Sequence, residues 1–350
     1  MAKGKRGEAR RTEPAVHRET RNPSGHVARH DPTIAGMPIF TVQPRGRKAA
    51  EAWDRNEGRF ERTEWLPVHN DTRFDEGNVE IRLSYPVWLS EMHESVLLGC
   101  LVLAGRIPPA RREFSPKVVP LATVSRSDER SASGRRDDRM AHAGASASAT
   151  VISTTPYALL EASGLAITGP NYKSLPEVLE DLFQIRYVYR GGSEERGGGT
   201  ELFNFEVEAG GRLRIWLSER LSRIFYTDAV PRPARFVSID MAERSSLKGE
   251  MARLLHRYLS VVVWQGERAR PFYPDTLLAQ VYRDPPEDRK AKFRRREGLC
   301  KALEQIAALD GWEIGMDSGR NDARFLVTRH RTRFADRAED VTAGEEGGDA

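Results

Sequence analysis

The stretch RKAKFRRREGLCKALEQI, residues 289–306, combines a basic beginning with the apolar spacing of a helix. At about 100° per residue, its apolar side chains fall on one side of that helix and are expected to face a core. These side chains are Phe293, Leu299, Cys300, Leu303, Ile306 and, just beyond the stretch, Ala307. Its basic side chains are Arg289, Lys290, Lys292, Arg294, Arg295, Arg296 and Lys301. Lys292 and Arg296 would point toward the core if the whole helix were packed, so the first turns are predicted to project beyond it.

Two interpretations of this basic run are open from the stretch alone. Lys and Arg are good helix formers, and a charge run on a helix is usually its solvated face. However, a solvated helix normally mixes Glu with Lys at four-residue spacing, whereas no acidic residue occurs between Arg289 and Arg296. The alternative to a hydrated helix is a surface that meets phosphate.

The neighbouring segments predict where this helix lies in a domain. Before it, GEMARLLHRYLSVVV predicts an apolar helix, and Asp275 is expected to cap the short helix TLLAQVY. The prolines of RDPPED cannot continue that short helix. After the basic stretch, WEIGM and ARFLVTRHR predict two strands around a turn that carries Arg320. This is the order of a winged helix, with the quoted stretch in the position of the recognition helix.

An earlier part of the chain predicts the same plan. Residues 90–105 predict a buried helix with Ser90 as its cap. TTPYALLEASG and NYKSLPEVLEDLFQ predict two more helices, the first of which ends at Gly164. IRYVYR and TELFNFEVE are expected to pair as a hairpin around GGSEERGGG, and RLRIWLSERLSRIFY is expected to begin the second domain.

The predicted fold class is therefore α+β, with two tandem winged-helix domains, disordered tails and a long flexible insert. Composition sets the expected boundaries. They are a disordered basic arm over 1–36, a first winged-helix domain over 37–210 with the insert at about 105–150, a second winged-helix domain over 211–336 and an acidic disordered tail over 337–350.

Composition also limits the class of protein. The formal net charge of +4 over 350 residues is small, so a nucleic-acid surface has to come from local clustering. Cys100 and Cys300 both lie in apolar helical patterns, which favours buried thiols over a disulfide. The uncharged apolar run 96–105 is too short to span a bilayer. The expectation is a cytoplasmic protein without a membrane partner.

No catalytic or cofactor site is expected. GGSEERGGGT lacks the residues of a phosphate-binding loop and joins two strands instead of opening a helix. His26 and His30 are four residues apart, but no third metal ligand accompanies them. His256 lies among core positions of a helix, and no nucleophile, base and acid can be grouped by spacing. The sequence thus predicts no enzyme, no cofactor and no metal.

The position of the basic helix favours DNA over simple hydration. In a winged helix, the helix that follows the tight turn presents its N-terminal half to the major groove, and the basic residues concentrate in that half. Lys and Arg contacts to phosphate would fix register, whereas an Arg that reaches the groove floor can read guanine. The sequence does not separate these two roles.

Several segments, in order, resemble the replication initiators of IncQ-type plasmids, the RepC-like proteins that bind origin repeats called iterons. They are GHVARHDP, PYALLEASG, NYKSLPEVLEDLFQI, RLRIWLSERL, GEMARLLHRYL, PDTLLAQVY, KAKFRRREGLCKALEQI and ALDGWEI, and they span most of residues 24–330. The resemblance implies tandem winged helices, binding to direct repeats in double-stranded origin DNA and opening of an adjacent AT-rich region. It also implies a replicative helicase and primase as partners, with self-association as a further expectation.

The same resemblance places DNA contacts on particular residues. They are Arg289, Lys290, Lys292, Arg294, Arg295, Arg296 and Lys301, with Arg320 at the wing and accessory contacts from Asn171, Tyr172 and Lys173. The segments 105–150 and 46–78 fit the family pattern poorly, so no contacts are carried over to them. A winged-helix transcriptional regulator and a scaffold that binds an acidic protein are the competing hypotheses.

Overall fold

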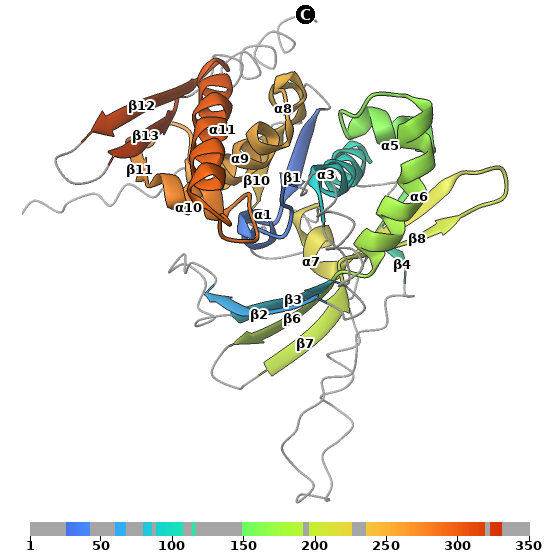
Figure 1. Cartoon of the computed structure of the whole chain (residues 1–350). Helices are drawn as coiled ribbons and strands as arrows, with labels where there is room; N and C mark the ends of the chain where they lie inside the picture. The colour runs from blue at the N-terminus through green and yellow to red at the C-terminus, as the bar shows by residue number, and fades with distance from the viewer. Residues whose placement is uncertain are drawn as a thin grey trace, which may run out of the picture. The chain divides into compact units, whose positions relative to one another are not determined.

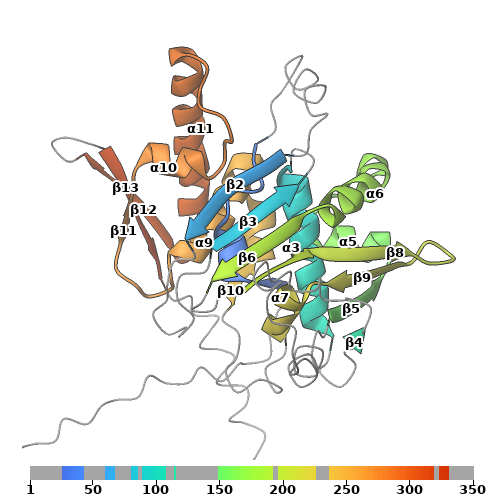
Figure 2. The same cartoon turned by 90° about the horizontal axis from the view of Figure 1, so that it is seen from below.

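The helices and strands of the C-terminal part follow one another as helix, strand, helix, helix and two strands. The computed structural model (Figure 1) describes residues 26–42, 60–67, 80–85, 89–107, 114–115, 149–191, 196–225, 236–318 and 323–330. In its C-terminal part the elements are α9 (Glu250–Val262), β11 (Arg270–Phe272), α10 (Pro274–Ala279), α11 (Arg289–Ala307), β12 (Trp312–Ser318) and β13 (Ala323–Arg329). Strand β13 lies between β11 and β12 in an antiparallel sheet, with Trp312 opposite Arg329 and Phe272 opposite Phe325. Figure 2 shows α10 and α11 beside this sheet.

The N-terminal part has a similar order, with one more strand before its second helix and with two strands of a separate sheet between α6 and β8. Its elements are α3 (Glu91–Arg106), β4 (Phe114–Ser115), β5 (Ala149–Thr154), α5 (Pro156–Ala162), α6 (Gly169–Phe183), β8 (Phe203–Val207) and β9 (Leu213–Leu217). The four strands form an antiparallel sheet in the order β4, β5, β9, β8. Helix α3 begins at the predicted Ser90 cap, whose side chain accepts from the Met92 amide at 3.2 Å. The turn after α5 also follows the prediction, since Gly164 has a φ of 66°.

A further sheet corrects the predicted hairpin. Strands β2 (Phe60–Pro67), β3 (Glu80–Tyr85), β6 (Arg186–Gly191) and β7 (Arg196–Glu201) form an antiparallel sheet in that order. The prediction joined IRYVYR to the whole of TELFNFEVE, but only residues 200 and 201 of that segment belong to β7. Residues 203–207 form β8 and pair with β9. The chain leaves one sheet for the other at Leu202, which is fully buried and donates to the Ile185 carbonyl.

The expected domain boundary between residues 210 and 211 therefore falls inside a hairpin. Gly210 and Gly211, both with positive φ, form the turn between β8 and β9. Ile215 and Leu217 of β9 are fully buried. Burial of this apolar face ties β9 to β5 and β8, so the strand belongs to the sheet of the N-terminal part, not to the C-terminal one.

The end of the predicted disordered arm is folded. Strand β1 (Val27–His30) pairs antiparallel with β10 (Val237–Asp240), and α1 (Pro32–Gly36) follows it. The alternation of β1 buries Ala28 and His30, and α1 buries Ile34 and Ala35. The prediction for residues 1–36 is thus wrong over 27–36, because this segment supplies core surface. The remainder of the predicted arm, most of the insert and the acidic tail lie outside the described residues.

Short elements connect the two parts. They are α7 (Glu219–Ser222), the 3-10 turn η2 (Arg223–Phe225) and α8 (Met241–Ser246). Helix α3 contacts β1 and α9, and α1 also packs against α9. The hydrophobic core formed by these contacts runs from Leu97 and Leu101 of α3 to Leu255 and Leu259 of α9. The described residues belong to one compact unit, Gly25–Arg331.

Candidate nucleic-acid interface

Helix α11 begins after the proline turn and is anchored by its C-terminal half. Asp288 is the N-cap, and its carboxylate accepts from the Ala291 amide at 2.5 Å. Leu299, Leu303 and Ile306 are buried against the core, as the apolar stripe predicted. Asp275 was expected to cap the preceding helix, but α10 begins at Pro274 and Asp275 lies within its first turn. Its carboxylate is left available to a side chain of α11.

The first two turns of α11 project beyond the core, as predicted. Lys292 and Arg296, which lie on the coreward side of the helix by periodicity, are both exposed. One element of the prediction is wrong. Phe293 was assigned to the core, yet it is 69% exposed, because the core ends near Leu299 and leaves the preceding turns uncovered.

Three of the predicted cations have partners within the protein. The Arg295 guanidinium lies over the Tyr282 ring, 4.1 Å from its centroid, and donates to the Asp284 carbonyl at 2.5 Å. Arg296 pairs with Asp275 at 3.0 Å. Lys301 pairs with Glu297 at 2.7 Å, and this hydrogen bond raises the pKa of the Lys301 ammonium. Arg295 thus holds α11 against the turn that precedes it, while the other two pairs are exposed.

The remaining four cations of the cluster have no ion-pair or hydrogen-bond partner among the residues that the structure describes. They are Arg289, Lys290, Lys292 and Arg294, hereafter the free cations of α11. The first turn of the helix contains no acidic residue. Because the N-terminus of a helix carries a partial positive charge, cations in its first turns are unfavourable for the isolated helix. An anion bound at this end would relieve that repulsion.

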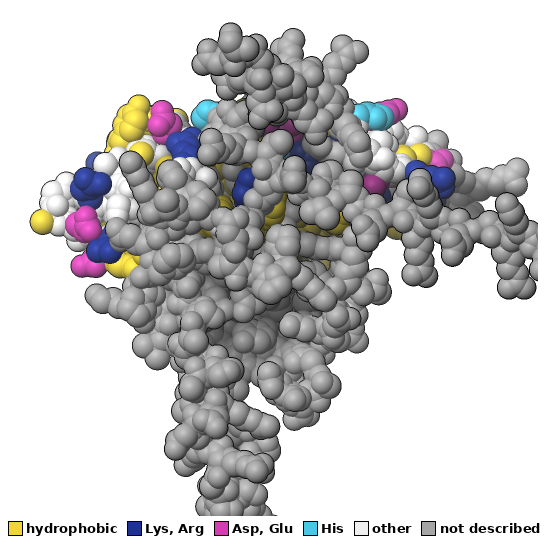
Figure 3. All heavy atoms as spheres, turned by 180° about the vertical axis from the view of Figure 1, so that it is seen from behind, with side chains coloured by type: hydrophobic (Ala, Val, Ile, Leu, Met, Phe, Trp, Pro, Cys, Tyr) yellow, Lys and Arg dark blue, Asp and Glu magenta, His cyan; other side chains and the backbone are white. Residues whose placement is uncertain are grey.

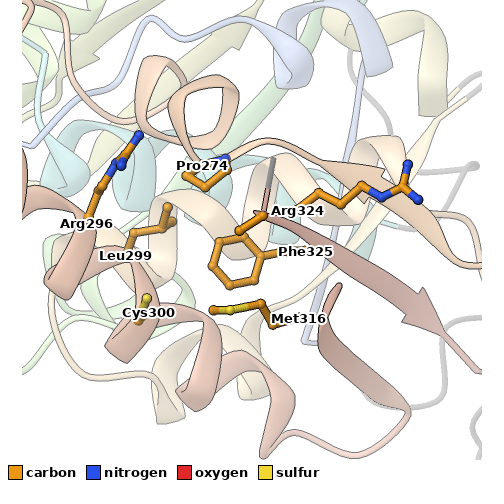
Figure 4. Close-up of a pocket in the computed structure, with 8 residues that line it drawn as sticks. Pro274, Arg296, Leu299, Cys300, Met316, Arg324 and Phe325 are labelled. Carbon is orange, nitrogen blue, oxygen red and sulfur yellow. The ribbon is translucent and has the colours of Figure 1, made fainter. Parts of the chain in front are cut away.

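The hairpin β12 and β13 flanks α11 on one side. Its tip, residues 319–322, lies outside the described residues, and with it the predicted contact residue Arg320. In the described part of the hairpin, Arg324 pairs with Asp317 at 2.8 Å. Between the helix and the hairpin is a small cavity of about 190 Å³ lined by Leu299, Met316 and Phe325. Figure 4 shows the guanidinium groups of Arg296 and Arg324 extending away from it on either side.

The accessory candidates lie on another helix. Asn171, Tyr172 and Lys173 are in the first turns of α6, which contacts α3, α5 and β8, whereas α11 contacts α9, α10 and β12. Asn171 has a structural contact, because its amide donates to the Ala166 carbonyl at 2.7 Å. Tyr172 and Lys173 are exposed. Since Lys173 is the one basic residue of α6, this helix lacks the charge density of α11.

On the face drawn in Figure 3, Lys and Arg side chains stand in small groups beside acidic and hydrophobic ones. The modest net charge of the chain is consistent with this mixture. Among the predicted contact residues, those in the first two turns of α11 are therefore the strongest candidate for binding an anionic ligand.

Sequence reasoning missed an ion network inside the protein. Arg244 of α8 lies 2.9 Å from Glu91 and 2.6 Å from Glu94, both on α3. Arg257 of α9 also pairs with Glu94, and Arg253 lies 3.4 Å from Glu91. Burial alone would raise the pKa of the Glu91 carboxyl, but the charge of Arg244 and the hydrogen bonds outweigh burial and lower it. A signal was present in the sequence, since two acidic residues lie in the first turn of a helix whose later turns are mostly apolar.

No group of three His, Cys, Asp or Glu side chains in the part of the chain that the structure describes is arranged to hold a metal ion. None of the helices described there is both long enough and apolar enough to cross a membrane.

Comparisons with known proteins give a family match. The model of the family described as Replication protein C (RepC) matches residues 140–330, more than half of the 350 residues. Among curated proteins no sequence matches. Similar solved structures include domains 2 and 3 of RctB, as selenomethionine derivatives, with 10% identity, a TM-score of 0.45, and coverage of 85% of this chain and 97% of that one. The Pi initiator protein in complex with iteron DNA has 14% identity and a TM-score of 0.39, covering 68% of this chain and 89% of that one.

Proposed function

The chain belongs to the replication protein C (RepC) family of replication initiators, and from this membership we propose that it binds direct repeats in a plasmid origin through α11. The family resemblance expected from the sequence is thereby confirmed. Binding to iterons would place the protein at the origin, where it promotes opening of an adjacent AT-rich region.

The arrangement of elements supports two tandem winged helices. In the C-terminal part, a long helix and a strand precede two helices, and two antiparallel strands follow them; the N-terminal part has the same order apart from β4, which precedes β5, and β6 and β7, which lie between α6 and β8. Helices α6 and α11 occupy the corresponding third position, which is the recognition helix of a winged helix. We assign α11 the main contact with DNA and α6 an accessory one, because α6 is poor in basic residues.

The observation that carries this proposal is the group of free cations on α11. Ordinary surface cations near a carboxylate form ion pairs, as Lys301 does with Glu297. Arg289, Lys290, Lys292 and Arg294 instead stand at the positive end of a helix, beyond the core and without an acidic partner among the described residues. A phosphate backbone supplies the missing negative charge, and the major groove is wide enough for the projecting turns.

Helicase recruitment belongs to the same proposal. An initiator that opens an AT-rich region has to bring a replicative helicase and primase to the exposed strands, and self-association on adjacent repeats would concentrate the protein there. The RepC membership supports these steps.

The test is binding of the full chain to a duplex of origin repeats and to a scrambled duplex of the same composition. Fluorescence anisotropy over a salt series should show tighter binding to the repeats and a loss of affinity as salt rises. Replacing all four free cations by Ala should make the salt dependence less steep, by about 0.9 in the log–log slope for each lost phosphate contact. Lys248→Ala, an exposed cation on another segment, is the matched control. Equal affinity for both duplexes at moderate salt contradicts the proposed function.

A further inference from the structure

The exposed ring of Phe293 has a particular place on α11. Single exposed apolar side chains are common on protein surfaces and need no special role. Phe293, however, is 69% exposed in the second turn of a helix whose preceding turn is cationic, while the acidic neighbour one turn further on, Glu297, is paired with Lys301. Viewed along the helix axis at about 100° per residue, Arg289 lies on one side of Phe293, and Lys290 and Arg294 lie on the other side. The ring is thus the apolar centre of a cationic surface.

This arrangement matches the cross-section of a major groove. Phosphates line the two walls of the groove, while the base edges form its floor. Cations on both flanks of a helix can reach the walls, and the side chain between them then faces the floor. The apolar group that the floor offers is the C5-methyl group of thymine. An aromatic ring in the central position is suited to that methyl and has no hydrogen bond to give to guanine or adenine.

We infer that Phe293 determines specificity by packing against the methyl group of a thymine in the origin repeat. The inference rests on the proposed function, because it requires α11 to enter the major groove. It adds a base-reading residue that was expected in the core, and it leaves phosphate contact to the free cations. Burial of the ring and the methyl would remove apolar surface of both partners from water.

The test compares thymine with uracil, which lacks only the methyl group. The full chain is titrated against the repeat duplex that it protects from nuclease, and against the same duplex with every thymine replaced by deoxyuridine. Wild type should bind the uracil duplex about fivefold more weakly for each contacted methyl. Phe293→Ala should bind both duplexes with equal affinity, close to that of wild type for the uracil duplex. Phe293→Leu, which keeps an apolar side chain, should retain part of the discrimination.

Three outcomes overturn the inference. They are equal binding of wild type to the thymine and uracil duplexes, wild-type discrimination retained by Phe293→Ala, and a loss of affinity by the same factor for both duplexes in Phe293→Ala. The last outcome indicates general docking or contact with a protein partner instead of methyl recognition. All three are distinguishable from failure of the proposed function, in which wild type does not prefer the repeats to a scrambled duplex. Circular dichroism of Phe293→Ala should match wild type, since the ring is outside the core.

Discussion

Arg244 on α8 and Glu94 on α3 form an ion pair inside the protein, with 2.6 Å between Nη2 and Oε2 and side chains that are 2% and 1% exposed. The two residues are 150 positions apart in the sequence. Glu94 also pairs with Arg257, whose guanidinium donates to the carbonyls of Ala35 and Met37. One carboxylate therefore joins α3 to α8 and α9 and, through Arg257, to the segment around α1.

We expect Glu94→Ala to destabilise the fold severely. Removing this carboxylate leaves the buried Arg257 guanidinium without a carboxylate partner and leaves Arg244 with Glu91 alone. Breaking a buried pair in this way typically costs about 3 to 5 kcal/mol. Urea denaturation followed by circular dichroism measures the free energy of unfolding. Glu297→Ala is the control, because its pair with Lys301 is exposed and should contribute less than about 1 kcal/mol. Similar losses for both variants would show that the internal network contributes little to stability.

The stability of the protein should fall as the pH drops below the ordinary pKa of histidine. Burial is the main cause that lowers the pKa of His30 to about 4 and also lowers that of His256. A lowered pKa means that the unfolded chain binds the proton first, so stability is fully present above about pH 6.5 and is lost toward the folded pKa. Between pH 6.5 and 5 the loss from His30 should approach about 1.4 kcal/mol per pH unit.

Denaturant titrations at several pH values test this dependence. His30→Asn should make the stability curve less steep between pH 6.5 and 5, whatever its effect on stability at pH 8. The same substitution at His330 is the control, because this histidine is exposed and is paired with Glu313 at 2.9 Å. A slope that is unchanged in His30→Asn would contradict the assignment.

Gly99→Ala should disrupt the contact between α3 and α5. A Cβ at residue 99 would lie 2.9 Å from the Ser163 backbone nitrogen and also collide with its hydroxyl group. Because backbone has to move, the expected loss is about 1 to 3 kcal/mol. Gly169→Ala is the matched control, since nothing lies within 4 Å of the added carbon and its φ is not positive. That control should be neutral or stabilise by about 0.4 to 1 kcal/mol. Melting temperatures of the two variants check the difference.

Local signals were sufficient for the helices. The Ser90 cap, the positive φ of Gly164 and the apolar stripe of α11 each depend on residues within a few positions of one another. Such signals act on the backbone directly, so helices α3, α5 and α11 could be predicted. The order of elements in the C-terminal part followed from them.

Partners that are distant in the chain could not be predicted. Strand β1 pairs with β10, and β9 pairs with β5, yet neither pairing leaves a mark in the local sequence. Residues 200–208 have the composition of one strand. They are divided at Leu202 because the residues before it pair with β6 and those after it pair with β9, in two different sheets. The periodicity of α11 likewise defines a face but not where the core ends, which is why Phe293 was misplaced. The cationic cluster was predictable because its residues are consecutive.

The last prediction separates binding from stability on α11. Lys290→Ala and Arg294→Ala should leave the free energy of unfolding within about 0.5 kcal/mol of wild type, because both side chains are exposed and unpaired among the described residues. A small gain in stability is consistent with removal of a cation from the positive end of a helix. Each variant should nevertheless weaken binding to origin repeats, by about 1 to 3 kcal/mol if the side chain reaches a base. Leu303→Ala is the converse control, since its buried side chain leaves a cavity that costs about 2 to 5 kcal/mol of stability. Should Arg294→Ala lose stability while keeping its affinity for the repeats, α11 is a structural helix and its cations do not form the interface.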